Sequence, residues 1–200
     1  MPGEILISTA YFPPAEYFNL IKNADAVFIE REENYIKQTY RNRCKILTSN
    51  GILNLSVPVM KGSSAKALVK DIEIDYSKRW QQVHIRAITS AYSRSPYFQF
   101  YSEQIGRILL KSHRFLPDLN DDLLCKCLEF LNIDKCIKHT SFFQPDSGLP
   151  QDFRYRISPK KGPGFTSRPY IQVFGDSGFV TDLSILDLLF NMGPEATGYI

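Results

Sequence analysis

The alternation of apolar and polar residues at the N-terminus predicts a strand, a helix and a second strand. Two short apolar runs, Ile5–Ser8 and Ala26–Ile29, suit the strands. Between them, Pro13-Pro14 opens a segment in which apolar residues recur at helical spacing from Tyr17 to Ile21. A βαβ start of this kind favours an α/β fold with parallel strands.

A β-hairpin is expected next. Arg43–Thr48 and Ile52–Val59 flank Asn50-Gly51, a pair that tight type I′ turns prefer. Apolar and polar residues alternate in the second segment, which predicts one buried and one solvent-facing side. The same period places three basic residues on one face of the first strand: Arg41, Arg43 and Lys45.

The middle of the chain predicts a short strand and three helices. Ile72–Ile74 suits the strand. An apolar stripe at helical spacing defines the first helix: Trp80, His84, Ile88 and Ala91. Ser95 is a good N-cap and Pro96 suits the first helical position, so we expect the second helix there. The third helix is expected to begin near Asn120, because the two aspartates that follow favour the helix dipole.

The C-terminal part of the chain predicts a long loop and a well-specified helix. Residues 144–169 are rich in proline, glycine and polar side chains. Ser184 and Asp187 form a pair like a capping box, and Gly193-Pro194 would end the helix. We therefore expect a single α/β domain over residues 1–200, with a mixed sheet and four to five helices.

Composition places the chain among ordinary globular proteins. The hydrophobic fraction is 44% and the charged fraction 22%, which argues against disorder. No run reaches the roughly 18 apolar residues that a membrane span needs. The N-terminus also lacks the basic start and apolar run of a signal peptide. We therefore expect no membrane span and a cytoplasmic location.

The four cysteines are expected to be reduced and structural. Cys125 and Cys127, with Cys136 and His139, superficially resemble zinc ligands. However, residues two apart on a helix point to different faces, so this spacing does not suit a zinc site there. Packing of small side chains is favoured over a metal site.

Charge distribution offers candidate contacts for a phosphate-bearing ligand. Two stretches, 34–70 and 153–175, contain several basic residues and no acid. The planar guanidinium groups of Arg43 and Arg154 suit phosphate, and Lys160 lies in a basic loop that could close over an anion. A solvated basic surface is the alternative. The net charge of +3 is too mild to predict nonspecific nucleic-acid binding.

Familiar catalytic motifs are missing, so candidates rest on single side chains. His84 would suit a general base, although its place on an apolar stripe also fits a core histidine. Tyr92, Tyr97 and Tyr101 span the junction of two helices. They could stack on a sugar, or they could simply join the helices.

Several segments together resemble the WbqC-like protein family over nearly the whole chain, by their order and spacing. They are Tyr11-Phe12-Pro13, Glu16-Tyr17-Phe18, Asn42-Arg43, Leu55–Val59, Trp80 with His84, Ala91–Phe98 with Tyr101, and Leu183–Gly193. One departure matters. Longer members begin with a His-Gln-Pro-Asn-type stretch, where this chain has residues 7–10, so chemistry that relies on that histidine is not expected here.

The resemblance implies an enzyme of O-antigen or related surface-glycan biosynthesis. It points to a transferase acting on a nucleotide- or lipid-linked amino sugar, with a phosphate-bearing small molecule such as a nucleotide sugar as ligand. Because the matching blocks contain them, the resemblance adds weight to Tyr11, Asn42 and Arg43 as ligand-binding residues. A non-catalytic accessory protein of the same pathway and an RNA-binding module are the alternatives. The sequence assigns no cofactor.

Overall fold

A computed structural model describes residues 3–60, 67–145, 151–162, 164–175 and 178–200. Its N-terminal part is the expected βαβ unit. Strand β1 (Glu4–Ser8) leads into helix α1 (Ala15–Asn23) and then strand β2 (Ala26–Glu30). The two strands are parallel, with Glu4 opposite Ala26.

Two further short strands complete a four-stranded parallel sheet. Strand β5 (Ile137–His139) pairs with β2, and strand β6 (Gln151–Asp152) pairs with β1, giving the order β5-β2-β1-β6. Strand β6 falls within the segment expected to be loop. Two residues are too few to show an alternation of apolar and polar positions. This strand is therefore recognised by its pairing with β1 and not from its own sequence. All four carboxyl ends meet at one edge of the sheet.

The two faces of this sheet are covered differently. Ile5, Ile7, Val27 and Ile29 are all at most 1% exposed and belong to the main hydrophobic core. Alternate residues point to the other face, where Leu6 and Phe28 line a pocket described below.

The hairpin forms a separate antiparallel sheet of strands β3 (Arg43–Thr48) and β4 (Gly51–Ser56). Its turn differs from the expected type I′. Such a turn needs positive φ at both central residues, which are Ser49 and Asn50 because Thr48 pairs with Gly51. Neither central residue has positive φ, and Gly51 takes it instead, at 91°.

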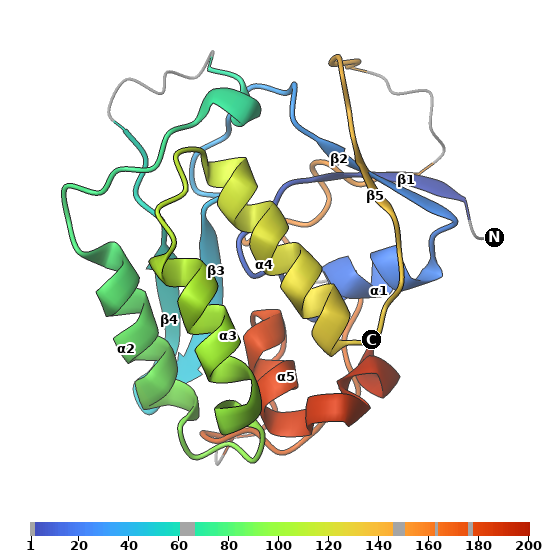
Figure 1. Cartoon of the computed structure of the whole chain (residues 1–200). Helices are drawn as coiled ribbons and strands as arrows, with labels where there is room; N and C mark the ends of the chain where they lie inside the picture. Colours follow the sequence, from blue (N-terminus) through green and yellow to red (C-terminus); the bar gives the residue numbers. More distant parts are fainter. Residues whose placement is uncertain (1–2, 61–66, 146–150, 163, 176–177) are drawn as a thin grey trace.

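The remaining α-helices are α2 (Trp80–Tyr92), α3 (Phe98–Leu110), α4 (Leu116–Phe130) and α5 (Ile185–Met192). Two 3-10 segments, Val69–Asp71 and Gly193–Tyr199, complete the described structure. In Figure 1 the parallel strands lie at the upper right, the hairpin with α2 and α3 at the left, and α4 between them. The expected α/β class, with parallel and antiparallel strands and five α-helices, is confirmed.

Several boundaries differ from expectation. Helix α3 begins at Phe98, because the Ser95 hydroxyl donates to the Tyr92 carbonyl and caps no helix. Helix α4 begins at Leu116, with Pro117 in its first turn. Residues 72–74 form only isolated bridges, with Val59 and Phe115 as partners.

Helix α5 begins where its cap predicted. Ser184 Oγ accepts the Leu186 N–H at 3.3 Å. Asp187 does not complete a capping box, since its carboxylate accepts from the Tyr170 hydroxyl at 2.7 Å and the Gln172 amide at 2.8 Å.

Within the described residues, no helix is long and apolar enough to cross a membrane. The same part of the chain contains no group of three or more His, Cys, Asp or Glu residues placed to hold a metal ion. Cys127 is buried in the core, whereas Cys125 and Cys136 are exposed.

Candidate functional site

Polar side chains gather at the carboxyl edge of the parallel sheet. Ser8 ends β1, Glu30 ends β2, His139 ends β5 and Asp152 ends β6. In open α/β sheets, ligands bind outside the carboxyl ends of the strands. The topology therefore directs attention to this edge.

A fully buried arginine joins these strand ends. Arg154 Nη1 lies 3.0 Å from Glu30 Oε2, and its Nε and Nη2 donate to the Asp152 carboxylate. The other Glu30 oxygen accepts from the Thr140 hydroxyl at 2.6 Å and from the Glu32 N–H at 2.8 Å. The ends of β2 and β6, and Thr140 just after β5, are thereby joined through Glu30 and Arg154.

A second buried pair lies beside the first. Arg41 Nη2 and Nε lie 2.6 Å and 2.9 Å from Glu33 Oε1. Burial raises the pKa of Glu33, while the Arg41 charge opposes that rise. The Ser8 hydroxyl accepts from Arg41 at 2.7 Å and donates to the Arg154 carbonyl at 2.8 Å. We call these residues, Ser8, Glu30, Glu33, Arg41, Asp152 and Arg154, the edge cluster.

A pocket of about 280 Å³ lies over the face of the sheet that the core leaves free. Leu6 and Phe28 form its floor, and the ring of Phe142 is 63% exposed beside it. The Glu30–Arg154 pair closes its charged end. We call it the sheet-face pocket, and its lining residues are Glu4, Leu6, Phe28, Glu30, His139, Thr140, Ser141, Phe142, Gln144 and Arg154.

Arg154 was expected to bind a phosphate, but its surroundings in the structure are acidic. Two carboxylates, Glu30 and Asp152, share its single guanidinium, so the group carries an excess of negative charge. Arg154 also has no exposed side-chain surface. The geometry therefore commits Arg154 to organising the sheet edge, and leaves it no free donor face for a phosphate.

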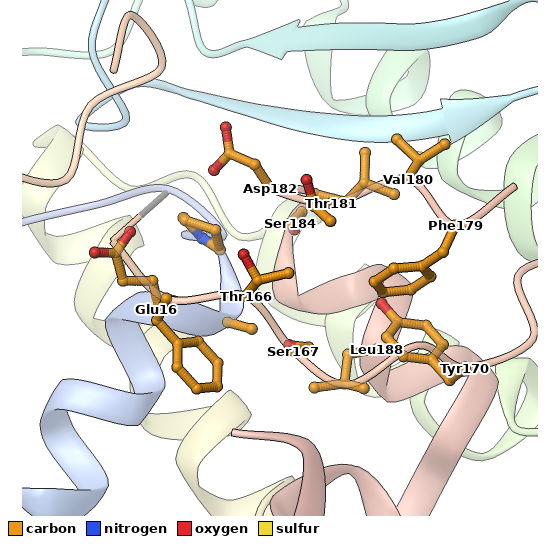
Figure 2. Close-up of a pocket in the computed structure, with 14 residues that line it drawn as sticks. Glu16, Thr166, Ser167, Tyr170, Phe179, Val180, Thr181, Asp182, Ser184 and Leu188 are labelled. Atoms are coloured by element: carbon orange, nitrogen blue, oxygen red, sulfur yellow. The ribbon is translucent and has the colours of Figure 1, made fainter. Parts of the chain in front are cut away.

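Two other hollows lie away from the sheet-face pocket. Figure 2 shows a narrow one between the start of α1 and residues 165–184, with Glu16 and Asp182 on one side. Both carboxylates already have donors: the Gly164 N–H for Glu16, and Tyr40 and Lys45 for Asp182. The other is an open apolar groove between residues 94–96, 169–173 and 191–199.

His84 and Tyr11 form a buried pair away from the sheet-face pocket. The Tyr11 hydroxyl lies 2.8 Å from His84 Nδ1, and the His84 ring also hydrogen-bonds the Ser56 backbone. His84 is only 3% exposed, and burial lowers its pKa to about 4. This arrangement fits a core histidine, the alternative that its apolar stripe left open.

Asn42 and Arg43 lie near this pair, at the end of the hairpin. The Asn42 amide donates to the Val57 carbonyl at 2.9 Å. Arg43 pairs with Ser56 in the hairpin, so the fold brings it close to His84. Arg43 is half-buried, and its Nε has no hydrogen-bond partner among the described residues.

The three candidate tyrosines contact neighbouring elements of the fold. The buried Tyr92 hydroxyl accepts the Leu47 N–H at 3.3 Å. The Tyr97 N–H donates to the Phe190 carbonyl, and the Tyr101 ring lies 4.5 Å from the Phe130 ring. Lys160 is exposed on a loop whose Pro163 lies outside the described residues.

Sequence reasoning missed the carboxylates of the edge cluster. The available signal was a polar residue directly after each apolar strand, as Ser8 follows Ile7 and Glu30 follows Ile29. Parallel pairing of those strands makes such residues neighbours. Residues 7–10 also fall at this edge, where they line a narrow cleft beside Arg41 and Arg154.

Fold and pocket together define an α/β protein with a ligand-sized pocket on one face of a parallel sheet, reaching its carboxyl edge. The model of the WbqC-like protein family matches residues 9–158, and the chain belongs to this family. It is similar to the uncharacterized protein Rv1507c of Mycobacterium tuberculosis (strain ATCC 25618 / H37Rv), with 26% identity covering 98% of this chain and 96% of that protein. No solved structure shows significant similarity.

Proposed function

We propose that this protein is an enzyme of bacterial surface-polysaccharide biosynthesis of the O-antigen type. It transfers a group to a nucleotide- or lipid-linked amino sugar whose sugar ring occupies the sheet-face pocket. The observation that carries this proposal is the pairing of an apolar floor with a buried carboxylate in one pocket. Membership of the WbqC-like family supports the pathway.

The pocket's chemistry suits a sugar ring. Phe28 and Phe142 offer aromatic surface to the apolar face of a ring. Thr140, Ser141 and Gln144 offer polar atoms for its hydroxyls. The carboxylates of Glu4 and Glu30, which both line the pocket, favour a cationic amine over an anion.

The same charge argues for phosphate groups that lie outside this pocket. Arg154 is neutralised by carboxylates, whereas Arg43 makes no ion pair within the described part of the chain. Arg43 lies beside His84 and lines none of the hollows described above, so it would contact a phosphate only outside the sheet-face pocket.

Thermal-shift measurements with a panel of nucleotide sugars test the proposal, because a ligand that prefers the folded state raises the melting temperature. Phe142→Ala should remove the shift, because it deletes a wall of the pocket. Phe100→Ala is the matched control, since Phe100 is 69% exposed on α3, outside this pocket.

A shift that survives Phe142→Ala unchanged would place the ligand elsewhere. No shift with any nucleotide sugar would contradict the proposal itself. Binding without turnover of any amino sugar would favour the accessory-protein alternative.

A further inference from the structure

His139 is the histidine that faces the sheet-face pocket. It ends strand β5, lines the pocket beside Thr140, and its side chain is 38% exposed. It therefore combines a fixed backbone position with access for a ligand.

A carboxylate holds one nitrogen of this ring. His139 Nε2 lies 2.7 Å from Asp121 Oδ2, and the Asp121 side chain is 19% exposed. A ring with its proton on Nε2, next to the carboxylate, has its lone pair on Nδ1. Nδ1 has no protein partner within the described residues, which leaves it free for a ligand.

Asp121 is itself fixed by an arginine. Arg31 Nη2 contacts the same Asp121 oxygen, and it also lies 3.4 Å from Asp118. Arg31 follows β2 directly, and Asp121 lies in the second turn of α4. The Asp121 carboxylate is thus held between the sheet edge and the helix, and it in turn orients the His139 imidazole.

The other two histidines lack this arrangement. His113 has a carboxylate partner as well, with Nε2 lying 2.8 Å from Asp122, but its Nδ1 lies 3.1 Å from the Lys111 carbonyl and the residue is 6% exposed. His84 contacts Tyr11 and the Ser56 backbone and is 3% exposed. Both rings have their nitrogens occupied by protein groups.

We propose that His139 is the proton acceptor of the sheet-face pocket and that Asp121 is its positioning residue. Nδ1 takes the proton from a hydroxyl or amino group of the bound sugar. The electron pair of the broken O–H or N–H bond stays on that oxygen or nitrogen, which becomes the nucleophile. The Asp121 carboxylate stabilises the imidazolium that forms. The identity of the sugar rests on the proposed function, whereas the reactivity of the imidazole does not.

Hydrolysis of p-nitrophenyl acetate tests the imidazole without the natural ligand, since an accessible, oriented imidazole accelerates ester cleavage. We expect His139→Gln to remove most of the rate above that of the buffer, and Asp121→Asn to reduce it about threefold to tenfold. His113→Gln and Asp122→Asn are the matched controls. They change a histidine–carboxylate pair outside the sheet-face pocket and should leave the rate unchanged.

Modification by diethyl pyrocarbonate, mapped by mass spectrometry on the wild-type chain, gives a readout that depends on no variant. We expect His139 to react at least about tenfold faster than His84 and His113, because its Nδ1 is accessible. Equal rates at the three histidines, or an esterase rate that Asp121→Asn leaves intact, would overturn the inference. If a nucleotide sugar raises the melting temperature but His139 is inert, the inference about His139 is overturned and the proposed function stands. If His139 is reactive but no sugar binds, only the proposed function is contradicted.

Discussion

At the scale of single residues, the most informative feature is charge buried at the sheet edge. Arg154, Glu30 and Glu33 have essentially no exposed side-chain surface. Removing one partner of such a pair costs about 3–5 kcal/mol, because the other charge is left buried alone. Charged groups held this way fix the strand ends, and with them the pocket wall.

His84 provides a residue-scale prediction on pH. Its folded-state pKa of about 4 lies below the usual value of 6.5, so the unfolded chain binds the proton more readily between these values. Its contribution to stability is complete above about pH 6.5 and is lost as pH falls towards 4. The gap between the two pKa values corresponds to roughly 3 kcal/mol.

Urea denaturation across that pH range measures this effect. We expect the free energy of unfolding of the wild type to fall towards that of His84→Gln as pH drops from about 7 to about 4.5. Parallel pH curves for the two proteins would show that His84 titrates normally and is not buried as described.

The residue scale also shows what pattern could and could not predict. Helical periodicity placed His84 on an apolar stripe, and that stripe is buried. The pairing of His139 with Asp121 joins two consecutive elements, α4 and β5, and depends on how they pack, so neither helical nor strand periodicity could reveal it. Arg154 was singled out as basic, but its carboxylate partner Glu30 lies on another strand.

At the scale of elements, helix ends were predicted correctly where the capping residue lies next to the helix in the sequence. Ser184 caps α5 and Gly193 follows its last residue, as expected. Strands β5 and β6 are three and two residues long, too short for a period to appear. Their positions depend on pairing with β2 and β1, which is a tertiary property.

Gly193 provides the element-scale prediction. It has φ of 54°, and an added Cβ would lie 2.4 Å from the Tyr97 ring. Gly193→Ala should therefore cost well over 1 kcal/mol, through backbone strain and the clash with the Tyr97 ring together. Gly51→Ala is the matched control, because Gly51 also has positive φ but nothing lies within 4 Å of its Cβ position.

Chemical denaturation compares the two variants. The larger loss at Gly193 would confirm that Tyr97 packs against the end of α5. Equal losses would mean that backbone strain alone matters and that Tyr97 is free to move towards a ligand.

At the scale of the whole molecule, the site results from an uneven covering of the sheet. One face of β1 and β2 packs into the core, and the other carries the sheet-face pocket beneath residues 139–144. The βαβ start allowed the parallel sheet to be predicted. The pocket was not predictable, because its walls come from β1, β2, the segment after β5 and Arg154.

The most direct test of the ligand site is an NMR titration of the ¹⁵N-labelled chain with nucleotide sugars that do and do not carry a free amine. We expect the largest changes in backbone amide shifts at the sheet-face pocket, at Leu6, Phe28, Thr140 and Phe142. We also expect nucleotide sugars with a free amine to bind more tightly than those without one. Changes confined to the apolar groove around Ile171 and Met192, or no changes at all, would contradict this account.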